Sequence, residues 1–342
     1  MPKKVFGLDI GTTSIKAVEI AVEKSELRLV AADEIPTPPR GLASESDLDQ
    51  QLLAGTIKKL IQLAKIDTKF VNTALPEAQV FTRVIEMPIL SEKELVSAIK
   101  WESEQYIPLP ESSISLDWEI LRKNPEKNNM DVLLVGAPMR LVAKYQKIME
   151  LANLEVVSME TELLAASHSL VWFSEKNTPT ILMHIGANST NLGIFKDGML
   201  VVGSTIPSGG NALTRAIAGE FGFETTQAEE YKKTYGLEKQ AFGGKIVVAL
   251  QPVLTSWLAE IKKAISFYQN KQLNSEIKRI IISGGGAKLP GLAIFFADSL
   301  GIEAELGNPW KHIKVDPKTF ETFASRAPAY VVATGLALRE YG

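Results

Sequence analysis

The chain has 342 residues, of which 45% are hydrophobic and 23% charged, with a net charge of −3 and no cysteine. This composition indicates a folded globular protein and excludes a disordered chain, a disulfide framework and cysteine metal sites. The weak, scattered charge disfavours nucleic-acid binding. Because the length exceeds what one hydrophobic core usually serves, we expect two domains. With no apolar signal-peptide core near the N-terminus, we expect a cytoplasmic protein.

The opening residues 5–20, VFGLDIGTTSIKAVEI, predict a β-hairpin, because two short β-branched segments flank a polar turn. The polar residues are Asp9, Gly11, Thr12, Thr13 and Ser14. No helix follows, so the segment is neither a Walker P-loop nor a dinucleotide fingerprint. Amides and hydroxyls in such a turn suit an anion, but the same residues also make an ordinary hairpin turn.

The next elements alternate between strand and helix patterns. A third strand is expected near 27–35, a helix over 48–64 and strands over 70–76 and 79–88. Ser91 followed by Glu94 is a capping-box pattern that predicts a helix ending near residue 106. Strands over 114–121 and 131–138 and a helix over 141–153 come next. We interpret residues 83–157 as an inserted β/α unit with its own small sheet.

Residues 180–200, TILMHIGANSTNLGIFKDGML, repeat the opening pattern with a turn one residue longer. Two such hairpins half a chain apart favour a two-lobed protein that holds one anion between its lobes over a coincidental pair. A third cluster lies within 277–301, where an apolar strand leads through Gly284, Gly285 and Gly286 into a helix with Pro290 near its start. Glycines there allow backbone to approach a base or ribose.

The segments LDIGTTSIK, HIGANSTNLGIF, AEEYKKTYG and SGGGAKLPGL resemble, in this order, the actin-like ATPase superfamily of Hsp70, sugar kinases, FtsA and MreB. FTRVIEMP, WESEQYIPLP and GLALR are similar to the PilM family of type IV pilus assembly machines. The resemblance covers nearly the whole chain. It implies an α/β, two-lobed actin-like fold of duplicated ribonuclease-H-like lobes. We expect no FtsA-type membrane-targeting helix after LREYG.

The resemblance also implies a division into four subdomains. Subdomain 1A would comprise 1–84 and 157–178, and the inserted subdomain 1C, of the FtsA/PilM type, 85–156. Subdomain 2A would comprise 179–205 and 280–342, and subdomain 2B 206–279.

One ATP and Mg²⁺ site between the lobes follows from the resemblance. Asp9 would hold Mg²⁺ through water, and the first turn with Lys16 would contact the β- and γ-phosphates. The second lobe would contribute Gly186, Asn188, Ser189, Thr190, Gly209 and Gly210. Glu229 would contact the ribose and Lys232 the adenine, with Gly284 to Gly286 lining the base. Glu229 and Lys232 are also spaced as an ordinary ion pair on one helix face.

Phosphoryl transfer to water is the chemistry that such a site implies. Glu162 matches the water-orienting acid of MreB-like relatives, and with Asp9 it forms the candidate catalytic pair. His184 stands where superfamily ATPases generally place aspartate, and imidazole is a poor ligand for Mg²⁺. We therefore expect ATP binding with slow or absent hydrolysis, although His184 can also be a packed strand residue.

The insertion implies a surface for partners. PilM-like proteins hold the N-terminal cytoplasmic peptide of PilN, so the resemblance places the chain at the cytoplasmic face of the inner membrane. It also implies contacts with other pilus proteins and allows self-association. Segments 80–85 and 107–110 are groove candidates, while Trp101 and Tyr106 are groove or core residues. We expect ATP to alter the partner surface by closing the lobes.

Two alternative functions belong to the same superfamily. One is an FtsA-like or secretion-system adaptor. The other is a small-metabolite kinase, which usually needs an acid to activate the substrate hydroxyl and larger insertions to enclose the substrate. The small insertion suits a partner surface better than an enclosed substrate site.

Overall fold

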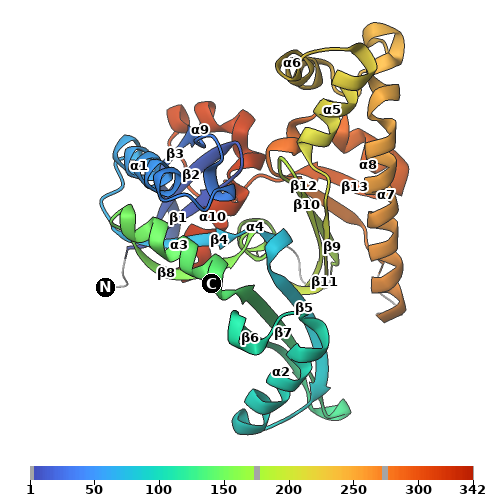
Figure 1. Cartoon of the computed structure of the whole chain (residues 1–342). Helices are drawn as coiled ribbons and strands as arrows, with labels where there is room; N and C mark the ends of the chain where they lie inside the picture. The colour runs from blue at the N-terminus through green and yellow to red at the C-terminus, as the bar shows by residue number, and fades with distance from the viewer. Residues whose placement is uncertain (1–3, 173–177, 272–275, 342) are drawn as a thin grey trace.

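The computed structural model describes residues 4–172, 178–271 and 276–341. Residues 1–3, 173–177, 272–275 and 342, which fall in the expected ranges of the two lobes, lie outside the described residues. In the described part, two five-stranded sheets form two lobes, and a three-stranded sheet projects from them (Figure 1).

The first sheet has the order β3-β2-β1-β4-β8. Its strands are β1 (Phe6–Ile10), β2 (Ser14–Glu23), β3 (Glu26–Pro36), β4 (Phe70–Leu75) and β8 (Glu155–Thr161). The first three strands run antiparallel to their chain neighbours, whereas β4 lies parallel to both β1 and β8. The opening segment therefore forms the predicted hairpin, with Asp9 directly opposite Lys16.

The second sheet repeats this arrangement in the order β11-β10-β9-β12-β13. Its strands are β9 (Thr180–Ile185), β10 (Thr190–Lys196), β11 (Met199–Ile206), β12 (Arg279–Ser283) and β13 (Glu303–Leu306). Two antiparallel pairings are again followed by two parallel ones. The duplication inferred from the two hairpins is therefore confirmed, and the turn before β10 is one residue longer than the turn before β2.

Helices cover the outer face of each sheet. α1 (Asp47–Ala64) and α3 (Met139–Leu151) share a buried core with β1 in the first lobe. The second lobe carries α5 (Gly210–Phe221), α6 (Thr225–Tyr235), α7 (Lys245–Lys271) and α8 (Leu292–Leu300). By length and composition α7 is apolar enough to cross a membrane. Its buried residues, including Leu250, Trp257 and Ile261, instead pack in the core of the second lobe, which explains that composition.

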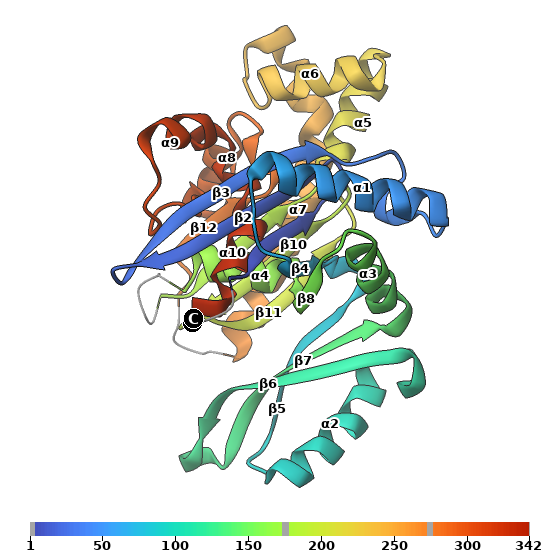
Figure 2. The ribbon, with the colours of Figure 1, turned by 90° about the vertical axis from the view of Figure 1, so that its left-hand side faces the viewer.

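Two helices lie between the sheets, α4 (Glu162–Leu170) and α10 (Val331–Leu338), and α9 (Pro317–Phe323) precedes α10 (Figure 2). Every residue of α10 is buried. Gly335 has no room for a side chain, because a Cβ there would lie 1.6 Å from the carbonyl oxygen of Ala165 in α4. A Cβ at Gly7 in β1 would lie 2.1 Å from the carbonyl oxygen of Ala333. Backbone-to-backbone packing therefore joins α10 to both α4 and β1.

The inserted sheet has the order β5-β7-β6 and is antiparallel throughout. It comprises β5 (Phe81–Pro88), β6 (Ile114–Asn124) and β7 (Asn129–Pro138), with α2 (Glu92–Tyr106) against it. The predicted capping box forms, since the Glu94 carboxylate accepts hydrogen bonds from the Ser91 amide and hydroxyl.

The expected end of the inserted subdomain at residue 156 would assign α3 to the insertion. Its side chains Tyr145 and Ile148 are buried in the same cluster as Phe6 and Leu8 of β1. α3 therefore shares the main core of the first lobe, although it also contacts β6 and β7 of the inserted sheet. We propose that the inserted subdomain ends near residue 138, where β7 ends.

Candidate functional site

The first polar turn brings an acid and a lysine together at the end of β1. The Asp9 carboxylate is buried and its Oδ2 lies 3.8 Å from Lys16 Nζ, which donates to Ser14 Oγ at 2.8 Å. Burial raises the pKa of Asp9, and the Lys16 charge opposes that shift. The Gly11 amide donates to the Ser14 carbonyl at 3.1 Å and closes the turn. The turn residues Thr12 and Thr13 remain exposed.

The second polar turn is joined to the start of α5. The Gly186 amide donates to the Ser189 carbonyl at 2.9 Å, and the Gly210 amide donates to the Gly186 carbonyl at 2.9 Å. A Cβ at Gly209 would lie 2.5 Å from that same carbonyl oxygen, so only glycine allows this approach. The turn and the N-terminus of α5 thus form one unit, whose partial positive charge suits an anion.

The side chains of this turn are held by hydrogen bonds. Asn188 Oδ1 accepts from Asn211 Nδ2 at 2.9 Å, and the buried Thr190 hydroxyl donates to the Ser208 carbonyl at 2.7 Å. Ser189 is half-buried, while Asn188 is exposed at the tip. Asn188 is therefore the side chain of this turn most accessible to a ligand.

Glu162 is the first residue of α4 and lies between the lobes. Its Oε2 accepts from Asn191 Nδ2 of β10 at 2.8 Å and from the Glu77 amide at 3.3 Å. Burial raises the pKa of Glu162 to about 7, and the charges of Asp9 and Glu77 add to the shift. Asp9 and Glu162 are therefore close enough to influence each other, as expected of a pair that shares one ligand.

His184 is a buried residue of β9, as its alternative interpretation anticipates. Its Nδ1 lies 3.1 Å from the hydroxyl oxygen of Ser283, its partner in the β9–β12 register. Burial and the charge of Lys16 lower the pKa of His184 to about 4, so the ring is neutral at pH 7. The charge of Lys16, in the first hairpin, therefore acts on His184, in the second.

Glu229 and Lys232 form the ion pair that their spacing allows. Lys232 Nζ lies 2.6 Å from Glu229 Oε2 and also donates to the Gly210 carbonyl at 3.1 Å and to Thr214 Oγ1 at 2.9 Å. The pair therefore anchors α6 to the first turn of α5. A ribose or adenine contact would use groups that already have this structural role.

The third glycine cluster packs against the end of β9. Gly284 has φ +85°, and a Cβ there would lie 2.4 Å from the carbonyl oxygen of Ile185. A Cβ at Gly286 would lie 2.3 Å from Ile185 Cγ2, whereas Gly285 has open space around it. Gly284 and Gly286 are thus required for packing, and Gly285 is the member of the cluster open to a ligand.

The charges of predicted site residues also act on Lys288 and Tyr145, two residues that were not among the predicted site residues. Lys288 is exposed, and partial burial together with the charges of Lys233, Lys16 and Arg326 lowers its pKa, while Glu34 opposes the shift. It therefore lies among charged groups of both lobes. Tyr145 is buried and its pKa is raised by burial and by the charges of Glu162 and Asp9. The SGGGAK segment carried the signal for Lys288, whereas nothing in α3 pointed to Tyr145.

The candidate peptide-groove residues lie at β5, in α2 and directly after α2. The Arg83 guanidinium lies 4.0 Å from the centroid of the Tyr106 ring, and Ile107 is buried. Trp101 is 62% exposed, so its interpretation as a core residue is wrong. A hollow of about 260 Å³ lies where the insertion joins the first lobe, between Leu42, Gln79 and Tyr145.

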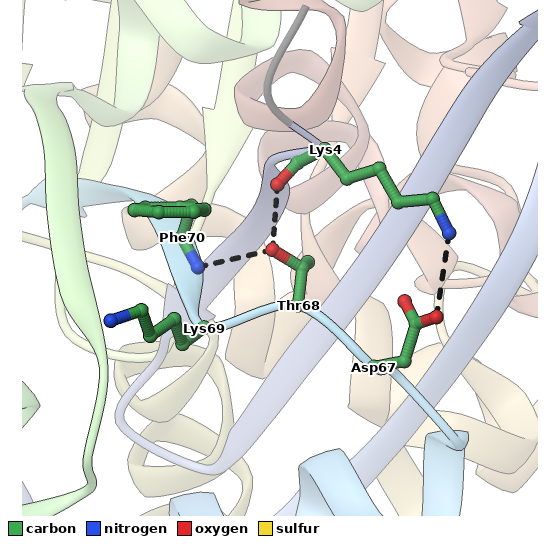
Figure 3. A pocket seen from close by; sticks show the side chains of 5 residues that line it. All are labelled: Lys4, Asp67, Thr68, Lys69 and Phe70. Atoms are coloured by element: carbon green, nitrogen blue, oxygen red, sulfur yellow. Dashed lines mark hydrogen bonds and ion pairs between the residues drawn. The ribbon is translucent and has the colours of Figure 1, made fainter. Parts of the chain in front are cut away.

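A second hollow, of about 490 Å³, lies at the other end of the first sheet (Figure 3). Thr68 donates to the Lys4 carbonyl at 2.6 Å, and Lys4 Nζ lies 3.4 Å from Asp67 Oδ2. These residues stand at the N-terminal ends of β1 and β4, whereas Asp9 lies near the C-terminal end of β1. This hollow is therefore separate from the two polar turns.

Comparison with solved structures defines the class. MreB5 of Spiroplasma citri bound to AMPPNP has a TM-score of 0.57 and 14% identity, over 100% of this chain and 97% of that chain. The PilM-PilN type IV pilus biogenesis complex has a TM-score of 0.86 and 31% identity, over 99% of each chain. The chain therefore has the two-lobed fold of the actin-like ATPases.

Sequence comparison narrows this class. The cell division protein FtsA of Enterococcus hirae is 24% identical over 344 aligned positions, which cover 89% of this chain and 78% of that protein. A family model described as type IV pilus assembly protein PilM matches residues 7–341. The chain belongs to this PilM family.

Proposed function

We propose that the chain binds ATP between its lobes and acts as a nucleotide-dependent scaffold of the type IV pilus assembly platform. The observation that carries the proposal is a pair of duplicated polar turns, one in each lobe, with the buried Asp9 carboxylate beside the first and a hydrogen bond from Asn191, just after the second, to Glu162. The interlobe bond from Asn191 to Glu162 and the influence of Lys16 on His184 support one shared ligand site. Lys16 and the α5 N-terminus would bind the phosphates from opposite lobes.

The donor set of the site fits Mg²⁺, which prefers oxygen ligands and keeps several waters. Asp9 and Glu162 offer carboxylate oxygens, and Thr12, Thr13 and Ser14 offer hydroxyls. Bound Mg²⁺ would neutralise charge on the β- and γ-phosphates. Since His184 is neutral and supplies no third carboxylate, we propose that hydrolysis is slow. Asp9 and Glu162 would hold and orient the ion and the attacking water.

We further propose that the chain binds the N-terminal cytoplasmic peptide of PilN and so acts at the cytoplasmic face of the inner membrane. The likeness to the PilM-PilN complex supports this partner. The hollow beside Leu42, Gln79 and Tyr145 offers a place of suitable size next to the inserted sheet. An extended peptide needs such apolar pockets together with polar groups that fix its backbone.

Isothermal titration with Mg-ATP tests the nucleotide site. We expect wild type to bind and Asp9→Ala to bind at least about tenfold more weakly, because one charged ligand is lost. Asp67→Ala is the matched control, since Asp67 is an exposed aspartate at the opposite end of the same sheet. Absence of binding by folded wild type, or equal binding by Asp9→Ala, would contradict the proposed site.

Titration with a synthetic peptide of the PilN N-terminus tests the partner. We expect Gln79→Arg to weaken binding by at least about fivefold, because the long charged side chain fills the hollow at the base of the insertion. Glu104→Arg, an exposed change on the far helix α2, should leave it unchanged. Equal effects of both variants would place the peptide elsewhere.

A further inference from the structure

Glu77 makes hydrogen bonds to both Glu162 and Leu163, the first two residues of α4, although Glu77 and Glu162 lie 85 residues apart. The Glu77 amide donates to Glu162 Oε2 at 3.3 Å, and Glu77 Oε2 accepts from the Leu163 amide at 3.1 Å. Glu77 is 7% exposed, so its carboxylate has been removed from water to make this contact. A buried carboxylate in this position has a local structural use, because it satisfies an amide in the first turn of α4.

The position of Glu77 in the chain connects this contact to the inserted sheet. Glu77 begins the 3-10 turn Glu77–Gln79, which joins β4 of the first lobe to β5 of the inserted sheet. The side chain of Glu77 thus holds the base of the insertion to the helix that carries Glu162. A displacement of either element changes both hydrogen bonds at once.

The same oxygen of Glu162 also contacts the second lobe. Asn191 Nδ2 of β10 donates to Glu162 Oε2 at 2.8 Å, and the Glu77 amide donates to this atom from the other side. The neighbouring apolar cluster has the same three contributors. It contains Leu163 of α4, Leu133 of the inserted sheet and Phe195 of β10. The second lobe, α4 and the insertion therefore meet at two places, the hydrogen bonds to Glu162 Oε2 and the apolar cluster that contains Leu163.

We propose that Glu77 is a positioning residue that transmits the position of the second lobe at the nucleotide site to the inserted sheet. This inference rests on the proposed nucleotide binding, because the nucleotide is what would change the Asn191 to Glu162 contact. When Asn191 moves, the hydrogen bond from the Glu77 amide to Glu162 Oε2 strengthens or weakens. The hydrogen bond from the Leu163 amide to the Glu77 carboxylate then changes with it. The close-packed apolar cluster that contains both Leu163 and Leu133 carries the same displacement into the sheet.

Hydrogen exchange of residues 76–88, measured with and without Mg-AMPPNP, tests this inference without any partner protein. In wild type we expect the nucleotide to change exchange of this segment by at least about fivefold, the lower end of typical coupling between sites. In Glu77→Ala the change should fall below about twofold while Mg-AMPPNP still binds. Glu77→Gln keeps an acceptor for the Leu163 amide and should retain the wild-type response.

The outcomes separate the two proposals. If wild type binds Mg-AMPPNP in titration but exchange of 76–88 does not respond, or if Glu77→Ala responds like wild type, the role of Glu77 is overturned and nucleotide binding stands. If folded wild type binds no nucleotide, the proposed function fails first. Should Glu77→Ala fail to fold, the wild-type and Glu77→Gln arms decide: loss of the response in Glu77→Gln would also overturn the inference.

Discussion

His184 is the residue that we expect to limit the hydrolysis of bound ATP. The buried neutral ring bonds to Ser283 and stands where the family resemblance implies an aspartate. His184→Asp adds a carboxylate near Lys16, and we expect it to raise Mg²⁺-dependent ATP turnover by at least about tenfold, because the metal gains a hard oxygen ligand. Phosphate release measures this. His184→Asn is the control, and equal turnover by all three proteins would show that residue 184 does not limit the reaction.

Glu160 and His168 form a buried pair away from the polar turns, with 3.5 Å between Glu160 Oε1 and His168 Nδ1. Burial raises the pKa of Glu160 from 4.5 to about 8, despite the opposing charge of Arg339. The folded state therefore holds an extra proton between these two values, and the stability that this proton provides is lost as the pH rises through about 8. Burial lowers the pKa of His168 to about 4, so His168 affects stability only under acidic conditions.

Replacement of Glu160 tests this assignment. We expect Glu160→Gln to be more stable than wild type at pH 9, by on the order of 1–3 kcal/mol, because glutamine never carries the buried charge. At pH 6 the advantage should be smaller, because folded Glu160 is then protonated, and it should vanish only below about pH 4.5, where Glu160 is protonated in the unfolded chain as well. Thermal unfolding at the two pH values measures the difference. An equal advantage at both values would mean that packing, and not ionisation, separates the two proteins.

The individual residues of the site were predicted where a local pattern exists. Asp9, Lys16 and the two turns follow from hairpin periodicity and turn composition, and the structure places them on two hairpins, one in each lobe. Glu77 and Asn191 have no such pattern, because their contacts join segments far apart in the chain. The roles of the predicted residues in ATP and Mg²⁺ binding stay predictions.

At the scale of elements, α10 imposes the strictest steric requirement. A Cβ at Gly335 would overlap the carbonyl oxygen of Ala165 in α4, and every residue of α10 is buried. We expect Gly335→Ala to destabilise the protein by at least about 3 kcal/mol or to prevent folding, because backbone must separate in a packed core. Soluble yield and thermal unfolding measure the effect.

Gly55→Ala provides the matched control for this prediction. Gly55 is also a helical glycine, in α1, but a Cβ there meets nothing within 4 Å. The substitution should be neutral or stabilise by up to about 1 kcal/mol, because alanine favours the helix. If both variants behaved alike, helix propensity and not close packing would explain the effect at Gly335.

The types of the elements were predictable from the sequence, but which elements pack against one another was less predictable. Period-two and helical spacing located the strands and helices, and the Ser91–Glu94 pattern marked the start of α2. Yet the apolar face of α3 fits any neighbouring sheet, so the burial of Tyr145 and Ile148 in the core of the first lobe was not predicted. α3 also contacts the inserted sheet, and the subdomain boundary at residue 156 stays a prediction.

At the scale of the whole molecule, the Asn191 to Glu162 bond ties the lobes together. Asn191→Asp places a second carboxylate against Glu162, whose pKa is about 7. At pH 8 both groups are ionised, and we expect the lobes to separate and the radius of gyration from X-ray scattering to rise. At pH 6 protonated Glu162 can donate to the new carboxylate, so the lobes should stay together.

Asn191→Ala distinguishes lost bonding from added repulsion. It removes the bond to Glu162 without adding charge, so its scattering profile should not differ between pH 6 and pH 8. A pH-dependent expansion in this control, equal to that of Asn191→Asp, would show that some other group drives the opening.

The buried position of α10 also affects how the chain folds while the ribosome synthesises it. α10 follows every strand of both sheets in the chain, yet it fills the space between β1, the first strand made, and α4. One apolar face of the first sheet therefore stays uncovered until nearly all of the remaining chain has been synthesised. Folding chaperones that shield nascent chains would have their longest contact at this face, around Gly7 of β1 and Val18 of β2.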